Sequence, residues 1–436
     1  MFLQNAIQKR IDDKNPVKVA LIGAGKFGSM FLSQVPSTRG IEVLVIADLK
    51  PDNAIKACKN VGWSDDLINK TKFVDTGADA IKLNEVEVVI EATGFPAAGI
   101  EHARQAFQNG KHIIMVNVEA DVLAGAALAK EANSAGVVYS MAYGDQPALT
   151  AEIVEWARAS GFNVTSAGKG TRYQPIYHKS SPDTVWDYYG LTHEEARKAG
   201  MNPKMFNSFL DGTKSGLEMA AIANACDLEV PTNGLLFPPC GMDDLANILK
   251  PLEFGGLLEK NGQVEVVSSL ERDGRPVFKD LRWGVYAVLE APNDYAASCF
   301  KQYGMNTDDT GKYSAMYKPF HLIGMELNIS VFSAALLNQA TGQTKKFTGD
   351  VVSTTKKNLK KSEILDGEGG ATVWGKLVPS RLSLSMEALP IGLAHGIKLK
   401  NEIEENKIIT WNDVDFSSND PAISYRRKME KDFKKS

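Results

Sequence analysis

The sequence is poor in cysteine and has no long hydrophobic run. Its 436 residues include only Cys58, Cys226, Cys240 and Cys299, without any C-x-x-C pair. Neither a disulfide framework nor a zinc site is therefore expected, and the thiols should be reduced and mostly buried. No apolar stretch reaches membrane-spanning length, and the segment before Pro16 has no apolar core for a signal peptide. These absences predict a cytoplasmic protein without a membrane partner.

The chain also lacks an excess of one charge. It has 49 Lys and Arg against 53 Asp and Glu, a net charge of -4, and its six histidines are scattered. A nucleic-acid surface is therefore not expected. A hydrophobic content of 44% is typical of a soluble protein, and the length allows two or three domains with cores of their own.

What the sequence does contain is a glycine motif after an apolar run, V-K-V-A-L-I-G-A-G-K-F-G at residues 17–28. The pattern predicts a buried strand, a tight turn at Gly23, a backbone close to a pyrophosphate at Gly25, and close helix packing at Gly28. Lys26 and Phe27 open the helix whose N–H groups and positive dipole face the phosphates. A strand-to-helix turn without a ligand is the alternative.

Asp48 follows the next apolar run, residues 41–47. A carboxylate there accepts hydrogen bonds from the ribose hydroxyls of NAD and repels the extra phosphate of NADP. Lys50 is near enough to soften this repulsion. The sequence therefore favours NAD, with NADP left open.

Apolar runs continue to alternate with helical patterns up to residue 160, which predicts a Rossmann-type doubly wound parallel sheet in an α/β protein. Further strands are expected at residues 86–91, 111–117 and 137–142, while residues 62–82 are expected to be irregular. Ligands of such sheets lie outside the carboxyl ends of the strands. Thr93, Gly94 and Asn117 are therefore candidate cofactor contacts, with a plain turn as the alternative for the first two.

Beyond residue 160 the composition changes twice. We expect a Rossmann domain at 1–160, a mixed α+β substrate domain at 161–348, a small β-rich domain at 349–416 and a polar tail at 417–436. No repeat or low-complexity tract stands out.

Several motifs along nearly the whole chain resemble one family. They are the glycine motif, N-V-E-A-D-V at 117–122, G-D-Q-P at 144–147, S-A-G-K-G at 166–170, D-G-T-K with E-M-A-A-I-A-N-A at 211–225, and K-P-F-H-L at 318–322. The chain is similar to the bacterial homoserine-dehydrogenase-like oxidoreductases that include the second type of 1-deoxy-D-xylulose 5-phosphate reductoisomerase. Residues 351–416 resemble an SAF domain. The likeness implies an NAD(P)-dependent oxidoreductase that acts on a CH–OH group of a small molecule.

One departure from the family bears on the substrate. The reductoisomerase uses NADPH and has a basic stretch where this chain has Asp48. An NAD enzyme more often oxidises, which favours a hydroxylated acid or sugar acid such as D-apionate, with or without a carbon-skeleton shift. The alternatives are the NADPH-dependent reductoisomerase, a homoserine-type dehydrogenase, and a non-catalytic NAD-binding sensor. A homo-oligomer is the common prior for such chains.

Lys169 is the first catalytic candidate, because an ammonium flanked by glycines at a strand end can approach a substrate oxygen and move a proton. The alternative is a turn lysine held there for backbone reasons. Asp145 and Glu119 can orient that lysine, bind substrate or hold a divalent metal. Each is equally well explained as a carboxylate at a helix N-terminus.

The remaining candidates concern the substrate. Lys214 is spaced i, i+4 from Glu218, which usually indicates a surface helix pair, although the resemblance allows Lys214 to reach a substrate anion. Arg172 can bind a carboxylate or phosphate with both guanidinium nitrogens, or be an exposed loop arginine. Lys318 and His321 are further substrate-binding candidates from K-P-F-H-L, although His321 lies in an apolar strand pattern that favours a core histidine.

Overall fold

The computed structural model describes residues 3–434, and the chain divides into two compact units. The first unit runs to Glu152 and includes residues 321–345, and the second comprises Ile153–Phe320 and the chain from Lys346 onward. The sequence predicts residues 161–348 as one domain, whereas in the structure residues 321–345 are part of the first unit. The other predicted boundaries stay predictions.

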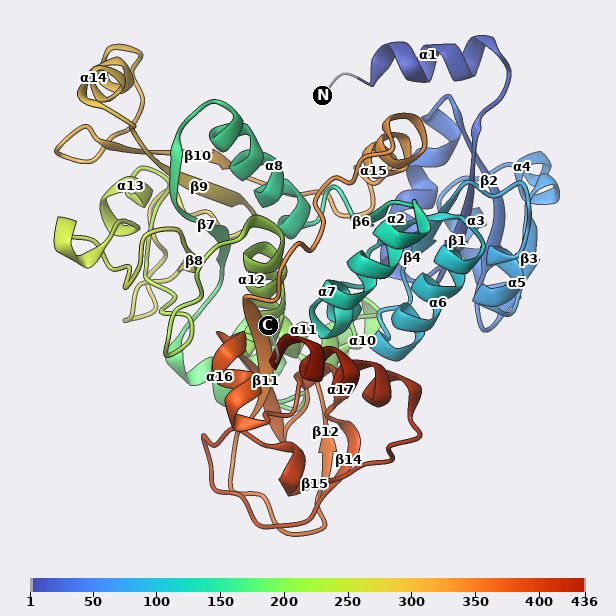
Figure 1. The fold of residues 1–436 in the computed structure, drawn as a ribbon. Coiled ribbons are helices and arrows are strands. Elements are labelled where there is room, and N and C mark those ends of the chain that lie inside the picture. The colour runs from blue at the N-terminus through green and yellow to red at the C-terminus, as the bar shows by residue number, and fades with distance from the viewer. Residues whose placement is uncertain (1–2, 435–436) are drawn as a thin grey trace. The chain divides into compact units, whose positions relative to one another are not determined.

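The first unit is built on a six-stranded parallel sheet (Figure 1). Its strands are β1 (Val17–Ile22), β2 (Ile41–Ala47), β3 (Lys72–Val74), β4 (Val88–Glu91), β5 (His112–Met115) and β6 (Tyr139–Met141). Their order is β3-β2-β1-β4-β5-β6, which is the doubly wound Rossmann order. The predicted α/β fold class is therefore confirmed, and the order of the strands reverses between β1 and β4.

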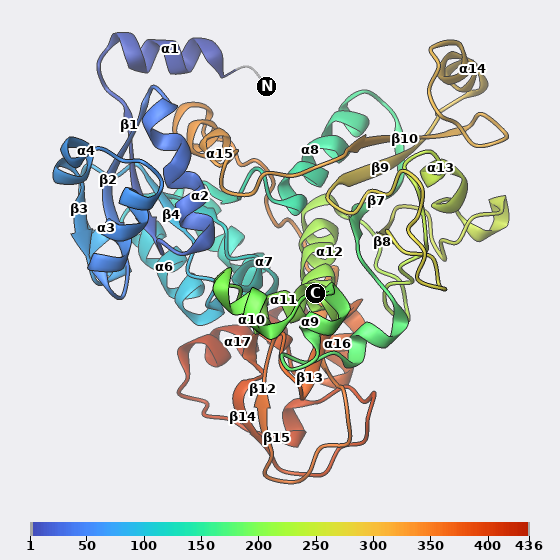
Figure 2. The same ribbon diagram turned by 180° about the vertical axis from the view of Figure 1, so that it is seen from behind.

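Helices connect these strands and cover the sheet (Figures 1 and 2). They are α2 (Lys26–Gln34), α3 (Pro51–Asn60), α4 (Asp65–Lys70), α5 (Gly77–Ile81), α6 (Pro96–Gln108) and α7 (Val118–Ala135). The helix α1 (Gln4–Asp12) precedes β1, and α8 (Gln146–Ala159) follows β6 and continues into the second unit. Because both faces of the sheet are covered, its strands are apolar runs, and all four residues of β4 are buried. The prediction of an irregular stretch at 62–82 is wrong, since it holds β3 and two helices.

Residues 321–345 complete the first unit. They contain α15 (Asn328–Phe332) and the π-helical turn that follows it, and Leu327 and Val331 lie in the same apolar core as Val17 and Phe31 of the sheet and α2. The N–H of Met141, at the end of β6, donates to the carbonyl of Gly342 at 2.8 Å. These contacts are remote in sequence, which is why the apolar pattern alone assigned the segment to a neighbouring domain.

The second unit contains a four-stranded mixed sheet in the order β10-β9-β7-β8. Its strands are β7 (Asn163–Thr171), β8 (Gln263–Ser268), β9 (Val285–Glu290) and β10 (Tyr313–Lys318). β7 is parallel to β8 and antiparallel to β9. The helices here are α9 (Val185–Tyr189), α10 (His193–Lys198), α11 (Pro203–Leu210), α12 (Thr213–Cys226), α13 (Leu245–Ile248) and α14 (Asp294–Gln302). All residues of α12 except Lys214 are buried, which makes it the central helix of this unit.

The rest of the second unit is β-rich, as its composition predicts. It contains β11 (Gly349–Thr355), β12 (Ile364–Asp366), β13 (Val373–Pro379), β14 (His395–Leu399) and β15 (Val414–Asp415), with α16 (Ser380–Met386) and α17 (Pro421–Lys434). β11 pairs with β13, and both pack against α12. The predicted polar tail is the helix α17, in which Arg426 is fully buried and ion-paired with Asp350. The SAF-like character of this part stays a prediction.

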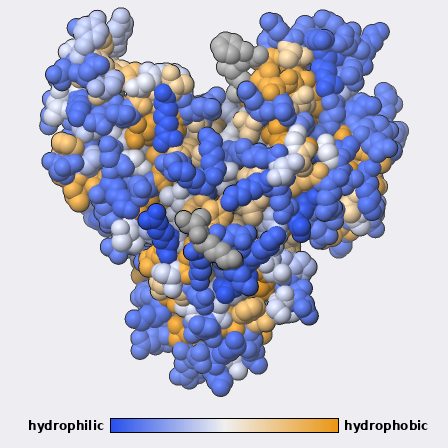
Figure 3. Space-filling model, in the orientation of Figure 1, coloured by the Kyte–Doolittle hydropathy of each residue, from blue (hydrophilic) through white to orange (hydrophobic). Residues whose placement is uncertain are grey.

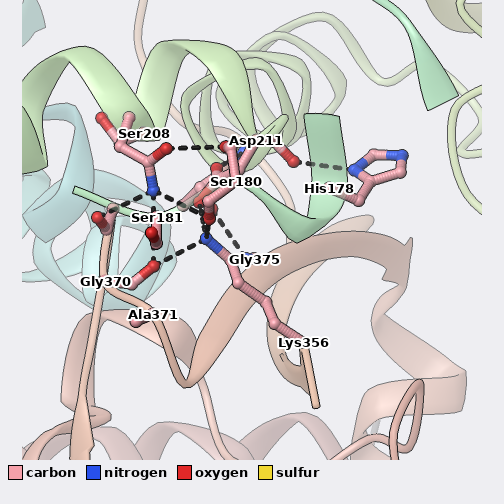
Figure 4. A network of polar contacts seen from close by, with 12 residues as sticks. His178, Ser180, Ser181, Ser208, Asp211, Lys356, Gly370, Ala371 and Gly375 are labelled. Atoms are coloured by element: carbon pink, nitrogen blue, oxygen red, sulfur yellow. Dashed lines mark hydrogen bonds and ion pairs between the residues drawn. The ribbon is translucent and has the colours of Figure 1, made fainter. Parts of the chain in front are cut away.

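A buried lysine joins the β-rich part to the helices of its unit. Nζ of Lys356, just after β11, lies 2.7 Å from Oδ2 of Asp211 and from the carbonyl oxygens of Ser180 and Gly370 (Figure 4). Lys356 and Asp211 have side-chain exposures of only 2% and 0%. Three acceptors for three ammonium protons satisfy the buried charge. The D-G-T-K motif at 211–214 therefore has a structural role through its aspartate.

The cysteines behave as the sequence predicts. All four thiols are free, and Cys58, Cys226 and Cys240 are buried. Burial raises the pKa of Cys58 to about 11 and that of Cys240 to about 12. These two thiols stay protonated near neutral pH and are poor nucleophiles.

Hydrophilic residues predominate on the face shown in Figure 3, with hydrophobic residues exposed in scattered places. Within residues 3–434, no helix is both long enough and apolar enough to span a lipid bilayer.

Candidate functional site

The glycine turn after β1 is shaped by close backbone packing. Gly23 has φ +95°, and a Cβ there would lie 2.7 Å from the carbonyl oxygen of Ala92. A Cβ at Gly28 would collide with the carbonyl oxygen of Gly23, because α2 is pressed against the turn. Only glycine fits at both positions. The geometry thus agrees with the predicted tight turn at Gly23 and the predicted close helix packing at Gly28.

Gly25 differs from its neighbours because a Cβ there would meet no atom within 4 Å. This residue is the N-cap of α2, which begins with Lys26 and Phe27. The first N–H groups of a helix lack partners within the helix, and the space beside the Cα of Gly25 at this helix start is open. A pyrophosphate can therefore approach the backbone at Gly25, and the residues present fit a dinucleotide.

Asp48 lies directly after β2, beside this turn. Its Oδ2 accepts the N–H of Ala24 at 3.2 Å, and its Oδ1 accepts the N–H of Lys50 at 3.0 Å. The side chain is half-buried, while Lys50 is exposed. Each carboxylate oxygen can accept a second hydrogen bond, so Asp48 can receive ribose hydroxyls while it holds the turn.

Thr93 and Asn117 come together at the carboxyl ends of β4 and β5. Nδ2 of Asn117 lies 3.4 Å from Oγ1 of Thr93, and its Oδ1 caps α7 by accepting the N–H of Ala120. Thr93 and Gly94 are exposed, whereas Asn117 is buried. The exposed pair is accessible to a ligand at the carboxyl edge of the sheet, and Asn117 positions it.

Next to Thr93, the structure contains a buried pair of an acid and a histidine, Glu91 and His102, which the sequence does not predict. Oε1 of Glu91, the last residue of β4, accepts the hydroxyl of Thr93 and lies 3.2 Å from Nδ1 of His102 on α6. Glu91 is fully buried, and its Oε2 has no hydrogen-bond partner among the described residues. The helical pattern of residues 96–109 gives no sign of a carboxylate beneath His102, so the sequence does not indicate this pair.

Three carboxylates are buried beyond the end of β5. Glu119 and Asp121 lie in the first turn of α7, and Asp145 precedes α8 and accepts the N–H of Gln146 at 2.8 Å. Burial raises the pKa of Asp121 to about 6. Asp121 and Asp145 both line a cavity of about 10 Å³, which holds at most one water. Glu119 and Asp145 thus occupy the helix N-terminal positions that were the alternative to a catalytic role.

The structure gives the divalent-metal hypothesis no ligand cluster. Among residues 3–434, no three side chains of His, Cys, Asp or Glu lie together as metal ligands would.

Lys169 lies within β7, not in a turn. It is buried and forms an ion pair with Glu218 of α12, which is also buried. The prediction that Glu218 forms a surface pair with Lys214 is wrong, because Glu218 faces the sheet and only Lys214 remains partly exposed. The i, i+4 spacing considers one helix alone and cannot show that a strand supplies the partner.

The glycines beside Lys169 have a backbone explanation. A Cβ at Gly168 would collide with the carbonyl oxygen of Glu265, and one at Gly170 with that of Leu281. Neighbouring chain segments therefore press on β7 on both sides of the lysine. The glycines thus allow close packing, and the ammonium group itself is the chemically informative feature.

Two arginines lie near the end of β7. Arg172 has a buried Nε without a hydrogen-bond partner among the described residues. Burial lowers the pKa of Arg282, and the positive charge of Arg172 lowers it further. Burial raises the pKa of Tyr189, against which both guanidinium charges act. Two positive charges that act on each other in a partly buried place favour the binding of an anion nearby. No motif marks Arg282 in the sequence.

Lys318 and His321 stand close in sequence but belong to different units. Lys318 ends β10, and its Nζ lies 6.0 Å from the ring centre of Phe320. His321 is half-buried in an irregular segment of the first unit, so the expected strand around it is wrong.

Two family models match the chain. The NAD-binding domain of homoserine dehydrogenase matches residues 23–142, and the catalytic domain of oxidoreductase DRL matches residues 144–327. The first match spans the glycine turn, Asp48 and Thr93, and the second spans Lys169, Arg172 and Arg282. The chain is an NAD(P)-dependent oxidoreductase. The candidate cofactor-binding residues of the enzyme thus lie in the first match, and the buried Lys169 lies in the second.

Solved structures of oxidoreductases resemble parts of the enzyme at low identity. A 3-ketoreductase from Actinomadura kijaniata is 16% identical over 37% of this chain and 50% of its own, with a TM-score of 0.26. A myo-inositol dehydrogenase from Corynebacterium glutamicum is 12% identical over 39% and 48%, with a TM-score of 0.29. An oxidoreductase from Klebsiella pneumoniae is 15% identical over 76% and 88%, with a TM-score of 0.39.

The enzyme therefore spans about half the length of the first two structures. Such TM-scores add nothing to the assignment, which rests on the two family models. No curated protein matched the sequence.

Proposed function

We propose that the enzyme oxidises the CH–OH group of a small hydroxylated acid, of the class of sugar acids such as D-apionate, and prefers NAD to NADP. The observation that carries this proposal is the buried Lys169–Glu218 pair on β7, together with Arg172, whose buried Nε has no hydrogen-bond partner among residues 3–434. Side chains three residues apart within a strand would point to opposite faces of the sheet, but Arg172 lies one residue beyond the end of β7 and is not bound by that alternation. A proton-transfer group and an anion-binding group this close along the chain suit a short polyhydroxy acid.

Lys169 supplies the proton chemistry in this proposal. Nζ of Lys169 first gives one of its ammonium protons to the carboxylate of Glu218, and the resulting neutral amine accepts the hydroxyl proton as the alcohol becomes a carbonyl. The bound cofactor supplies the hydride acceptor at its nicotinamide. Burial of Lys169 and Glu218 keeps water away from this proton transfer and strengthens their interaction.

Arg172 and Arg282 bind the anionic end of the substrate. A carboxylate matches the guanidinium fork, and it relieves the repulsion between the two cations. This interaction orients the carbinol carbon and adds binding energy away from the reacting atoms.

Asp48 sets the cofactor preference. Its carboxylate receives the ribose hydroxyls of NAD and repels a phosphate at the same place. A second candidate, the NADPH-dependent reduction and isomerisation of 1-deoxy-D-xylulose 5-phosphate, rests on the resemblance of the sequence motifs to that family.

An oxidation screen tests the two candidates. Purified enzyme is mixed with NAD or NADP and a panel of four- to six-carbon sugar acids, and reduced nicotinamide is followed by absorbance. The reverse reaction contains NADPH and 1-deoxy-D-xylulose 5-phosphate. We expect turnover of a sugar acid with NAD. Turnover in the NADPH reaction alone would contradict the proposal and support the second candidate.

The same assay tests Asp48. Asp48→Asn keeps an oxygen for the N–H of Ala24 but removes the charge, so the preference for NAD over NADP should fall by about tenfold or more, since one charge contact of about 1.4 kcal/mol corresponds to that factor. Asp52→Asn, at an exposed position of α3, is the matched control. An unchanged preference in Asp48→Asn would remove Asp48 from the ribose site.

A further inference from the structure

A cavity of about 190 Å³ lies inside the second unit, between the N-terminus of α12 and β13. None of the functions above uses it. Its lining combines aromatic rings, glycines and one lysine: His178, Gly212, Gly216, Asn233, Gly234, Leu235, Phe237, Trp374, Gly375, Lys376 and Leu377.

The cavity is separate from the Lys169–Glu218 pair. Gly212 and Gly216 are four residues apart and face the cavity, so they lie on one side of α12. Glu218 is two residues beyond Gly216, which is about 200° around a helix with 3.6 residues per turn and places it roughly on the opposite side. One helix thus borders two different sites.

The loop that forms one wall is held from two sides. The carboxylate of Glu265 accepts the N–H groups of Leu236 at 3.1 Å and of Phe237 at 3.3 Å. Nη2 of Arg272 donates to the carbonyl oxygens of the same two residues at 3.0 Å. Phe237 is kept at φ +51° by these contacts. The wall is therefore fixed before any ligand arrives, which lowers the entropic cost of binding.

Aromatic rings form much of the remaining surface. The ring of Trp374 stacks on that of His178 with centroids 4.0 Å apart, and Tyr173 stacks on Phe237 at the same separation. Figure 4 shows His178 pointing its Nδ1 at the carbonyl oxygen of Asp211, 2.7 Å away. Flat, polarisable walls favour a flat ligand.

Lys376 provides the formal charge of the lining. Because Nδ1 of His178 donates to a carbonyl, Nε2 is left to accept the hydroxyl of Tyr173 at 3.0 Å, and burial lowers the pKa of the ring. His178 is therefore neutral at pH 7. None of the described lining residues is acidic, and the positive end of the α12 dipole adds to the charge of Lys376.

We propose that this cavity binds a flat organic monoanion about the size of benzoate. A dry cavity of about 150 Å³ takes up benzene, so about 190 Å³ has room for one six-membered ring and a carboxylate. The ring lies against the aromatic wall, and the carboxylate meets Lys376 at the end of α12. This site stands independently of the oxidation proposed for Lys169.

Calorimetric titration of the full-length enzyme with sodium benzoate, and with neutral benzamide as its isostere, tests the proposal. Benzoate should bind at least about tenfold more tightly than benzamide, because a hydrogen bond to a charged group is worth that factor. Lys376→Met should reduce the affinity for benzoate to that for benzamide. Lys398→Met, at an exposed position of β14, is the matched control and should leave both affinities unchanged.

Tryptophan fluorescence locates the bound anion. Quenching by benzoate should disappear in Trp374→Phe, whereas the affinity measured by heat should persist. No binding of benzoate, equal binding of benzamide to the unaltered enzyme, or unchanged benzoate affinity in a folded Lys376→Met variant would each overturn the proposal. The comparison of the two ligands on the unaltered enzyme needs no variant and decides the matter even if Lys376→Met does not fold.

Discussion

Asp121 is a buried carboxyl group that makes the stability of the first unit depend on pH. It accepts hydrogen bonds from the hydroxyls of Tyr139 at 2.8 Å and Thr344 at 2.9 Å. Burial nevertheless outweighs these bonds and raises its pKa from 3.8 to about 6. An acid whose native pKa is raised stabilises the fold fully below its unfolded pKa and loses that contribution as the pH rises through the native value.

Asp121→Asn should therefore remove a pH dependence. The stability of the unaltered protein contains a contribution that falls by roughly 3 kcal/mol between about pH 4 and pH 7, from a shift of about two pKa units. Asp121→Asn has no carboxyl group to ionise at this position, so its free energy of unfolding should increase with pH relative to that of the unaltered protein. Chemical denaturation of both proteins across this range measures the effect, with exposed Asp52→Asn as control. Parallel pH profiles would show that Asp121 does not ionise as inferred.

Single residues also show what the sequence can reveal about the site. Gly23, Gly25, Gly28 and Asp48 follow from a local motif, because the strand, the turn and the helix that they shape are contiguous in the chain. Glu218 does not, because its partner Lys169 is 49 residues away and on another element. Arg282 lies near Gly170 and Arg172 because the chain segment before β9 is held next to β7. The spacing of these residues in the sequence does not predict this.

At the scale of elements, α12 organises the second unit. One side borders the cavity, another carries Glu218, and its first turn follows Asp211, which anchors Lys356. Oδ1 of Asp211 also accepts the N–H of Thr213 at 2.9 Å. One carboxylate therefore fixes both the start of α12 and the β-rich part.

Lys356→Met should consequently be costly, because it leaves Asp211 buried without its cation. Breaking a buried pair in this way typically costs about 3–5 kcal/mol. The exposed pair of Lys346 and Asp227 provides a control, and Lys346→Met should cost less than about 1 kcal/mol. Denaturant unfolding of the three proteins measures both effects. Equal losses for the two variants would contradict the anchoring role of Lys356.

At the scale of the whole molecule, the candidate cofactor-binding residues and the buried Lys169 belong to separate units. The first unit follows from the sequence because apolar strands and helices alternate there, and the Rossmann order results from short right-handed connections. Its last segment, 321–345, does not, because its place depends on contacts such as that of Met141 with Gly342. The second unit mixes parallel and antiparallel pairing, and no single periodicity predicts its sheet.

The central claim is that Lys169 transfers the proton during oxidation of a hydroxyl group. The deciding measurement is the turnover of Lys169→Met on the substrate found by the screen, together with its affinity for NAD. We expect kcat to fall by about 10² to 10⁴ while NAD binding changes little, because proton transfer contributes that much and the candidate cofactor-binding residues lie in the other unit. Lys260→Met, at an exposed ion pair, should keep full activity.

Lys169→Met also leaves the carboxylate of Glu218 buried without its cation, which can destabilise the variant. The double variant Lys169→Met with Glu218→Gln avoids that charge and should show the same loss of turnover in a folded protein with intact NAD binding. Turnover close to that of the unaltered enzyme in either folded variant would contradict the account and leave Lys169 as a structural ion pair.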